Sequence, residues 1–393
     1  MARVNPALIR QLNAARVFHA VRLTPGASQR RLSELTGLDK ATISAVVGQL
    51  VDDGLLSGVK ASSGRPGRPE VALTVAPQAG VLIGARLELG SVRLMAASLA
   101  GDPIRTVQHP VGREPDEALA LLTRTVPELI DALGAEYGPV RALGVGVPAL
   151  FDEHGALALA PNLGWRDVPV RERLRAELHV PVYVDNDTKA AVLAETLFGT
   201  CREAQDILFV AGQSGIGAAL YLGGRLYRGH SGFAGELGHV KVRPGGRPCG
   251  CGGRGCLEAY ASEAAMLRSA AEAGLPARDL PALVTAANEG DRTARRILRQ
   301  AGDLLGNACA DLVTLLNPER IVLGGAIAAA ASYLIPRMRT RLDRRALGPP
   351  RARCVVQASS FGEDAVTMGG VALALEGVLS LPAWMLAREF RTG

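Results

Sequence analysis

The sequence predicts an α/β body preceded by a small, basic, helical domain, and three observations support this fold class. The chain has 393 residues and a net charge of +6, of which +5 lies in residues 1–80. Beyond Gly80, strand-like apolar runs alternate with helical ones, the pattern of an α/β fold. Hydrophobic residues make up 48% of the chain and aromatic residues only 4%, so it can bury large aliphatic cores. We therefore expect a basic domain at residues 1–76 and a nearly neutral body at 77–393, which excludes proteins that are basic throughout.

The first domain is predicted to be a helix-turn-helix. Apolar residues recur at helical spacing in residues 6 to about 23, 28–35 and 40 to about 53. Gly37 provides a tight turn before the third helix, and Asp39 is a suitable N-cap for it. Helix, glycine turn and helix at this spacing form the helix-turn-helix pattern. We expect these apolar side chains to face inward: Leu32, Leu35, Ile43, Val46, Val47, Leu50 and Val51.

A wing is predicted after the third helix, because short strand-like segments flank a loop containing Arg65 and Arg68 among glycines and prolines. Such a thin, extended, arginine-bearing loop fits a DNA minor groove. The start of the third helix would face the major groove or its phosphates. We therefore expect DNA contacts from Lys40, Thr42, Ser44, Arg65 and Arg68. The alternative is a helical cap used only for oligomerisation, but the local charge of +5 favours DNA.

The body is predicted to form two lobes with a cleft between them. Strands are expected at residues 81–86, 93–99, 143–147, 182–184, 207–210, 218–222 and 321–323. Helices are expected at residues 115–133, 170–178, 189–198, 257–273, 291–316 and 365–375. We place one lobe at about 77–190 together with the C-terminal helix, and the other at 191–375.

The strongest chemical signal is the set His239, Cys249, Cys251 and Cys256. Three thiolates and one imidazole match the Cys3His ligands of a four-coordinate structural zinc site. Reduced core thiols and a redox pair are the alternatives, but the cysteines lie on a loop with four glycines, which would pack poorly in a core. Because a closed ligand set leaves no open position for catalysis, we expect Zn²⁺ to fix the geometry of this loop.

The segment from Gly235 to His239, Gly-Glu-Leu-Gly-His, and the cysteine loop that runs on to Glu258 resemble the signature of the ROK family. That family contains bacterial sugar kinases and sugar-responsive transcriptional repressors, and the repressors carry a winged helix-turn-helix in front. The resemblance extends from about Gly80 over nearly the whole chain. It implies an actin-like, hexokinase-type pair of lobes with a sugar in the cleft.

The resemblance also implies the sugar-binding residues. They are Asn162, Asn186, Asp187, Glu236, His239 and Glu258. In the kinases the residue matching Asp187 is the general base, and the residue matching His239 is also a zinc ligand. Amides and carboxylates suit a ring of hydroxyl groups because they accept and donate several hydrogen bonds at once.

The kinases of this family have a phosphate loop, Asp-x-Gly-Gly-Thr, after the first strand. In the matching stretch, Arg86 replaces the aspartate, and Glu88 and Leu89 replace the glycines. A carboxylate where a triphosphate would lie is strongly unfavourable. We therefore expect no ATP binding and no catalytic residue, although residues 213–217 and 317–325 stay closer to the family pattern.

These observations together predict a repressor that a sugar releases from operator DNA. We expect a homodimer or homotetramer, because paired modules bind paired half-sites. The alternatives are an ATP-dependent, glucokinase-like sugar kinase with an accessory DNA-binding domain, and a constitutive DNA-binding protein with a vestigial cleft. Since we find no signal peptide and no apolar run long enough to span a bilayer, we expect a cytoplasmic protein without membrane partners.

Overall fold

The computed structural model describes residues 6–60, 71–152, 154–212 and 215–380. The N-terminal domain contains three helices, α1 (Pro6–Leu23), α2 (Gln29–Thr36) and α3 (Lys40–Asp52). Two antiparallel strands follow, β1 (Leu56–Lys60) and β2 (Val71–Val75). The predicted N-cap is confirmed, since the Asp39 carboxylate accepts hydrogen bonds from the Thr42 backbone N–H (2.9 Å) and hydroxyl (2.6 Å). Arg65 and Arg68, predicted in the wing, lie outside the described residues.

In the second and third helices the core follows the predicted faces with two exceptions, whereas Ile9 and Leu12 of the first predicted face are exposed. Leu32, Ile43, Val46, Val47 and Leu50 are buried as expected. The expectations for Leu35 and Val51 were wrong, because their exposed fractions are 43% and 41%. Thr36, four residues after Leu32 on the same helical face, is buried in place of Leu35. The inward stripe of each short helix is therefore narrower than the run of apolar residues suggests.

The body contains two five-stranded sheets with the same strand order. In the first sheet the order is β10 (Val182–Asn186), β6 (Val140–Val147), β3 (Val81–Glu88), β4 (Ser91–Ser98) and β5 (Pro103–Pro110). In the second sheet the order is β15 (Val355–Ala358), β14 (Arg320–Gly325), β11 (Ile207–Gly212), β12 (Ile216–Leu222) and β13 (Arg225–Tyr227). Each sheet thus begins with an antiparallel three-stranded meander, and two parallel strands extend it beside the first strand of that meander. The two lobes therefore repeat one topology.

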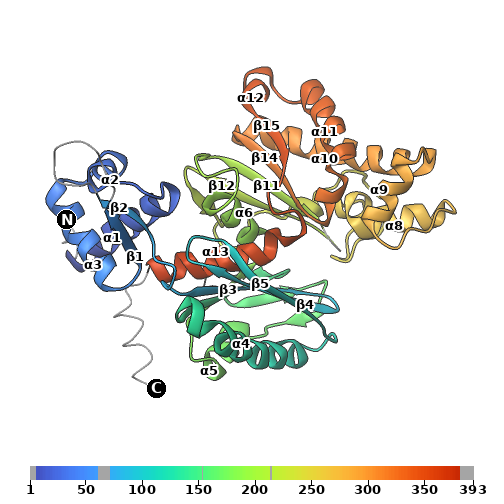
Figure 1. Cartoon of the computed structure of the whole chain (residues 1–393). Helices are drawn as coiled ribbons and strands as arrows, with labels where there is room; N and C mark the ends of the chain where they lie inside the picture. The colour runs from blue at the N-terminus through green and yellow to red at the C-terminus, as the bar shows by residue number, and fades with distance from the viewer. Residues whose placement is uncertain (1–5, 61–70, 153, 213–214, 381–393) are drawn as a thin grey trace.

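The helices form three layers around these sheets (Figure 1). α4 (Pro115–Tyr137) and α5 (Val170–Glu177) pack on the outer face of the first sheet. α6 (Asp187–Leu197) and α13 (Ala365–Ser380) lie between the two sheets, where α13 contacts β3 and β6 and α6 contacts β11 and β12. α10 (Arg292–Leu316) and α11 (Ala331–Arg345) cover the outer face of the second sheet. The boundary expected between the two lobes, near residue 190, falls within α6.

The remaining elements are smaller additions to the two sheets and their covering helices. They are the small sheet of β7 (Leu150–Phe151), β8 (Leu157–Ala160) and β9 (Trp165–Arg166), the helices α7 (Glu258–Ala261), α8 (Glu263–Glu272), α9 (Leu280–Asn288) and α12 (Gly348–Arg353), and the 3-10 turns η1 (Leu237–His239), η2 (Ala326–Ala330) and η3 (Gly362–Asp364). The helix predicted at residues 257–273 is broken at Ser262, whose hydroxyl caps α8 by accepting from the Ala265 N–H at 3.1 Å. No helix among the described residues is long and apolar enough to cross a membrane.

The N-terminal domain is joined to the first lobe by a shared apolar core. Val17, Phe18 and Val21 of α1 belong to the same buried cluster as residues of β3, β4, α6 and α13. At the edge of this core the Arg22 guanidinium lies 4.9 Å from the centre of the Phe198 ring, directly after α6. Figure 1 shows the end of α13 reaching the N-terminal domain. The two domains are therefore packed together rather than tethered by a linker.

Candidate ligand site and metal centre

The junction of β10 and α6 places Asn186 and Asp187 at the start of a buried helix. The Asn186 side-chain oxygen accepts hydrogen bonds from the backbone N–H groups of Thr188 and Lys189, both at 3.0 Å, and so caps α6. One Asp187 carboxylate oxygen accepts from the Thr188 N–H at 2.6 Å. The same oxygen accepts from the Thr188 hydroxyl at 3.1 Å, and no hydrogen bond to the other oxygen, Oδ2, is found among the described residues.

Burial raises the pKa of the Asp187 carboxyl above its ordinary value. Hydrogen bonds from Thr188 and the positive charge of Arg86 lower this pKa, while the negative charge of Glu88 raises it further. Arg86 and Glu88 are therefore electrostatic neighbours of Asp187. The β3–β4 hairpin, which is the predicted position of the phosphate loop, therefore lies close to the start of α6.

Asn162 and Glu258 converge on Gly215. A Cβ atom at Gly215 would lie 2.2 Å from Glu258 Oε2 and 3.1 Å from the side-chain nitrogen of Asn162, so a side chain there would have to displace both groups. Glu258 Oε2 also accepts a hydrogen bond from the Ile216 backbone N–H at 3.1 Å. Residues far apart in the sequence thus meet at the end of the β11–β12 hairpin.

Glu236 and His239 complete the group. The Glu236 side chain is 44% exposed, and its Oε2 lies 3.7 Å from His239 Nε2. Partial burial raises the pKa of the Glu236 carboxyl, His239 and Lys189 lower it, and Asp187 and Glu258 raise it. The structure therefore brings the six predicted ligand residues into one neighbourhood at the facing edges of the two lobes.

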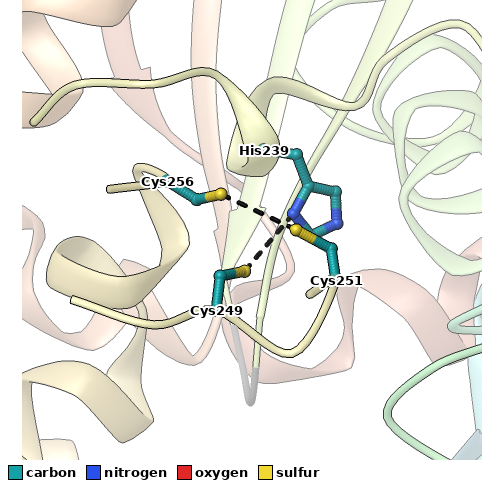
Figure 2. A group of neighbouring side chains, drawn as sticks. All are labelled: His239, Cys249, Cys251 and Cys256. Carbon is teal, nitrogen blue, oxygen red and sulfur yellow. Dashed lines mark hydrogen bonds between the residues drawn. The ribbon is translucent and has the colours of Figure 1, made fainter. Parts of the chain in front are cut away.

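The four predicted metal ligands also meet, and Figure 2 shows their side chains pointing toward one another. The ligand atoms of His239, Cys249, Cys251 and Cys256 all lie within 4.8 Å of one another. Cys249 Sγ is 3.6 Å from His239 Nδ1, and Cys251 Sγ is 3.7 Å from Cys256 Sγ. In a tetrahedral zinc site the corresponding edges are about 3.6 Å for sulfur to nitrogen and about 3.8 Å for sulfur to sulfur. The cluster therefore has the donors and the size to hold one metal ion.

The local backbone explains how a short loop can turn these side chains inward. Gly255 has φ of +79°, and a Cβ atom there would lie 1.8 Å from the Arg243 carbonyl oxygen, so the turn into Cys256 requires glycine. Cys256 is buried and receives a hydrogen bond from Lys241 Nζ at 2.7 Å, whereas Cys251 is exposed. The ammonium of Lys241 is suited to stabilise a thiolate at Cys256.

His239 connects the two groups. Its Nδ1 faces Cys249 and its Nε2 faces Glu236. If Nδ1 binds a metal, Nε2 carries the proton and becomes a hydrogen-bond donor on the side of the ligand residues. A metal bound to this cluster would therefore also orient His239 toward Glu236.

The position of the kinase phosphate loop is filled by an ion pair. Arg86 Nη2 donates to Glu88 Oε1 at 2.6 Å, and Ser91 Oγ donates to the same oxygen at 2.6 Å. Arg86 Nη1 donates to the Glu363 carbonyl at 3.0 Å, and its side chain is only 9% exposed. The pair therefore closes the β3–β4 hairpin and links it to the segment that begins α13. The sequence identified these residues but not this link.

The predicted DNA-contacting residues of α3 differ in availability. Lys40 and Ser44 are exposed. Thr42 is half-buried, and its hydroxyl is engaged in capping α3 through Asp39. Sequence reasoning missed three other residues that matter for the site: Lys189, Asp185 and Arg228. For Lys189, the sequence offered one signal, a lysine within the apolar run of α6.

Comparison with known proteins identifies the family of this chain. The sequence profile of the ROK family matches residues 87–377, and that of the MarR family matches residues 10–68. The chain belongs to the ROK family. The xylose repressor of Caldicellulosiruptor bescii is 27% identical over 396 residues, which cover 97% of this chain and 99% of the repressor.

Two solved structures of this family, a regulator and an enzyme, match the chain to different extents. A ROK family transcriptional regulator, described as a homologue of the E. coli MLC protein, matches with a TM-score of 0.82 and 28% identity, covering 98% of this chain and 100% of that one. A ROK family glucokinase from Streptomyces griseus, in complex with glucose and AMPPNP, matches with a TM-score of 0.66 and 26% identity. The glucokinase is covered completely but accounts for only 76% of this chain.

Proposed function

We propose that this protein is a transcriptional repressor that binds operator DNA through its winged helix-turn-helix and is released when a sugar binds between its lobes. The observation that carries the proposal is the packing of a DNA-binding fold directly onto the lobe that holds Asn186 and Asp187. The regulators named above match this chain over nearly its whole length, which supports a regulator over a kinase.

The sugar site combines Asn162, Asn186, Asp187, Glu236, His239 and Glu258. The free oxygen of Asp187 and the carboxylates of Glu236 and Glu258 accept hydrogen bonds from sugar hydroxyls, and the Asn162 amide can both donate and accept. His239 donates through Nε2. Four acceptors and two donors in one neighbourhood suit a ligand with a ring of hydroxyl groups.

The metal is Zn²⁺, held by His239, Cys249, Cys251 and Cys256. The Cys3His donor set and the 3.6 and 3.7 Å separations support zinc over a cation that prefers oxygen ligands. Zinc would supply a four-coordinate cross-link between η1 and the cysteine loop. That cross-link holds Glu236 and His239 on one side and Glu258 on the other at the sugar.

Kinase activity is not part of this proposal. The Arg86–Glu88 pair places a carboxylate where the γ-phosphate would need a cradle of backbone N–H groups. Asp187 then serves as a hydrogen-bond acceptor for the sugar and not as a general base. A coupled assay with ATP and a hexose should show no turnover; ATP consumption that Asp187→Ala abolishes would establish the kinase alternative instead.

On the DNA side, Lys40 and Ser44 contact the major groove, Thr42 stabilises the start of α3 and contacts the adjacent backbone, and Arg65 and Arg68 contact the minor groove. A homodimer or homotetramer presents two such modules to a palindromic operator. Arg65→Ala and Arg68→Ala should weaken DNA binding and flatten its dependence on salt, because each removes a charge that displaces counterions.

Helix α6 provides the route from sugar to DNA. It has 11 residues, about 16 Å, with Asp187 at its first turn and Phe198 directly after its last residue. Since the Phe198 ring contacts Arg22 of α1, a small rotation of α6 on sugar binding moves the helix-turn-helix. Such coupling requires that the two orientations bind the sugar with different affinities.

Two measurements test the proposal. Fluorescence anisotropy with DNA from upstream of the gene should show binding that weakens steeply with salt. A thermal-shift screen with glucose, xylose, N-acetylglucosamine and related sugars should find a ligand that raises the melting temperature, since only ligands of the native state do so. The same sugar should lower DNA affinity. Salt-insensitive or absent DNA binding would refute a repressor, and DNA binding that no sugar alters would establish the constitutive alternative.

A further inference from the structure

Lys189 is a buried charge inside the ligand site. It lies in the first turn of α6, two residues after Asp187, and is only 4% exposed. Its ammonium donates a hydrogen bond to the Gly232 carbonyl at 2.5 Å. The charges of Asp185, Arg228 and Glu236 act on it. The surrounding helix residues, Ala190 to Ala194, are apolar, so the charge is exceptional for its position.

A buried ammonium is destabilising unless nearby groups compensate it. An apolar side chain of the same length would fill this space without that penalty. The Gly232 carbonyl satisfies one of the three ammonium donors, and the carboxylates of Asp185 and Glu236 supply opposite charge. Packing alone therefore does not account for a lysine here. Two of its three partners, Gly232 and Glu236, lie on the segment that ends at Glu236, a proposed sugar-binding residue.

That segment, residues 228–236, connects β13 to η1 and ends at Glu236. It is fixed to the first lobe at two points, by Arg228, whose Nη1 donates to Asp185 Oδ1 at 3.0 Å as part of a two-pronged ion pair, and by the bond from Lys189 to Gly232. The backbone at Gly232 also packs against the Phe151 carbonyl. The position of Glu236 relative to Asp187 is thus set by contacts between α6 and this segment.

We propose that Lys189 is a positioning residue of the sugar site, which anchors the segment 228–236 through Gly232 and holds the Glu236 carboxylate toward the ligand. Three carboxylates, those of Asp187, Glu236 and Glu258, face one another across the site. The ammonium offsets their mutual repulsion at the point where Glu236 would otherwise turn to solvent. This inference rests on the proposed sugar-binding function and adds a residue to it.

The test is a double-mutant cycle in the full-length protein, with sugar affinity measured by calorimetry. The sugar is the one that gives the largest thermal shift with the wild-type protein. Lys189→Met should weaken sugar binding by at least tenfold, while DNA affinity without sugar changes less than twofold. Glu236→Gln should also weaken sugar binding in the wild-type background. In the Lys189→Met background the same substitution should have little further effect, because Lys189 acts through Glu236.

Two further variants complete the design. Lys189→Gln, which keeps a hydrogen-bond donor without the charge, replaces Lys189→Met in the cycle if the latter does not fold. Arg202→Met is the matched control, since Arg202 donates to the Phe198 carbonyl at the other end of α6 and should not affect sugar affinity.

Three outcomes would overturn the inference. Additive effects of the two substitutions would assign Lys189 a merely structural role and overturn the inference. Equal sugar affinities of the wild-type and Lys189→Met proteins would also overturn it while leaving sugar binding intact. If no sugar in the screen binds the wild-type protein, the proposed function fails together with this inference.

Discussion

The two lobes share one strand order but differ in what the first hairpin of each sheet does. In the first lobe the β3–β4 hairpin is closed by the Arg86–Glu88 pair and tied to the start of α13. In the second lobe the β11–β12 hairpin ends at Gly215, where the absence of a side chain lets Asn162 and Glu258 approach each other. The first hairpin thus serves as an internal brace, and the second lies at the proposed sugar site.

The lobes also differ in what stabilises their part of the site. Asn186 and Asp187 of the first lobe are fixed by regular structure, at the junction of a parallel strand and a buried helix. Glu236, His239 and Glu258 of the second lobe lie on short turns around the cysteine cluster. The first lobe thus holds its residues by regular secondary structure, and the second lobe holds its residues by turns next to the candidate metal cluster.

The largest effect is expected from breaking the metal centre of the second lobe. Cys251→Ser removes an exposed ligand, so it should disrupt metal binding without opening a cavity in the core. We expect loss of one bound zinc per chain, a fall in the melting temperature of several degrees, and at least a hundredfold loss of sugar affinity, because structural zinc contributes directly to local folding. Metal analysis by mass spectrometry and a thermal-shift assay measure these changes.

Cys354→Ser is the control for that experiment, since Cys354 is a buried thiol outside the cluster. It should leave the zinc content unchanged. Full sugar binding by a zinc-free Cys251→Ser protein would show that the second lobe does not depend on the metal for its part of the site.

A smaller effect, confined to the first lobe, is expected for Asp187→Asn. Hydrogen bonds to charged groups contribute about 1.5–3 kcal/mol, so sugar affinity should fall by roughly 10- to 150-fold. The melting temperature should not fall, because burial disfavours the charged form of Asp187 in the folded state. Calorimetry with the sugar and anisotropy with operator DNA should show a protein that binds DNA normally but responds to sugar only at correspondingly higher concentrations.

Asp116→Asn on the exposed surface of α4 serves as the comparison for Asp187→Asn. An Asp187→Asn protein that retains wild-type sugar affinity would contradict the assignment of this residue to the site.

A more subtle effect is expected where the first lobe meets the DNA-binding domain. Arg22→Met keeps an unbranched apolar stem but removes the cation that lies over Phe198, an interaction of about 2 kcal/mol when desolvated. The ratio of DNA affinities without and with saturating sugar should shrink by about fivefold, while sugar affinity and sugar-free DNA affinity stay within twofold of wild type. An unchanged ratio would show that α6 does not transmit the sugar signal through this contact.

The smallest effect is a pH dependence of stability that belongs to the second lobe. Burial alone would raise the pKa of Asp303, but hydrogen bonds from Arg341 and Arg337 outweigh it and hold the pKa at about 2. Because this pKa is depressed below the ordinary value of 3.8, the contribution is present above pH 4 and is lost as the pH falls toward 2. It amounts to at most about 2 kcal/mol.

Urea unfolding of the wild-type and Asp303→Asn proteins at pH 5 and pH 3 measures this contribution. The variant should be less stable at pH 5, and the difference should shrink at pH 3. A constant difference at both values would exclude the pair of arginines as the source.

The features that the sequence predicted correctly are those fixed by short-range rules. The Asp39 cap of α3 follows from the preference for aspartate at a helix N-terminus, and the metal cluster follows from the spacing of its cysteines. Predictions based on apolar runs were less reliable. Leu35 and Val51 are exposed, and the expected helix at residues 257–273 breaks at Ser262, because burial and capping depend on what packs against each residue.

Edge strands were missed for a related reason. None of the β5 residues is fully buried, so its sequence lacks the apolar pattern of a strand. Only its pairing with β4 in the structure identifies it.

By itself, the sequence determined the helix-turn-helix, the alternation of strands and helices in the body and the donor set of the metal centre, because these depend on neighbours a few residues apart. The tertiary structure decided three things: that both sheets share one topology, that Arg86 braces the first hairpin through Glu88 and Glu363, and that α6 runs from Asp187 to the DNA-binding domain. Each of these joins residues separated by long stretches of chain. Contacts of that kind depend on how whole elements pack, which no local pattern specifies.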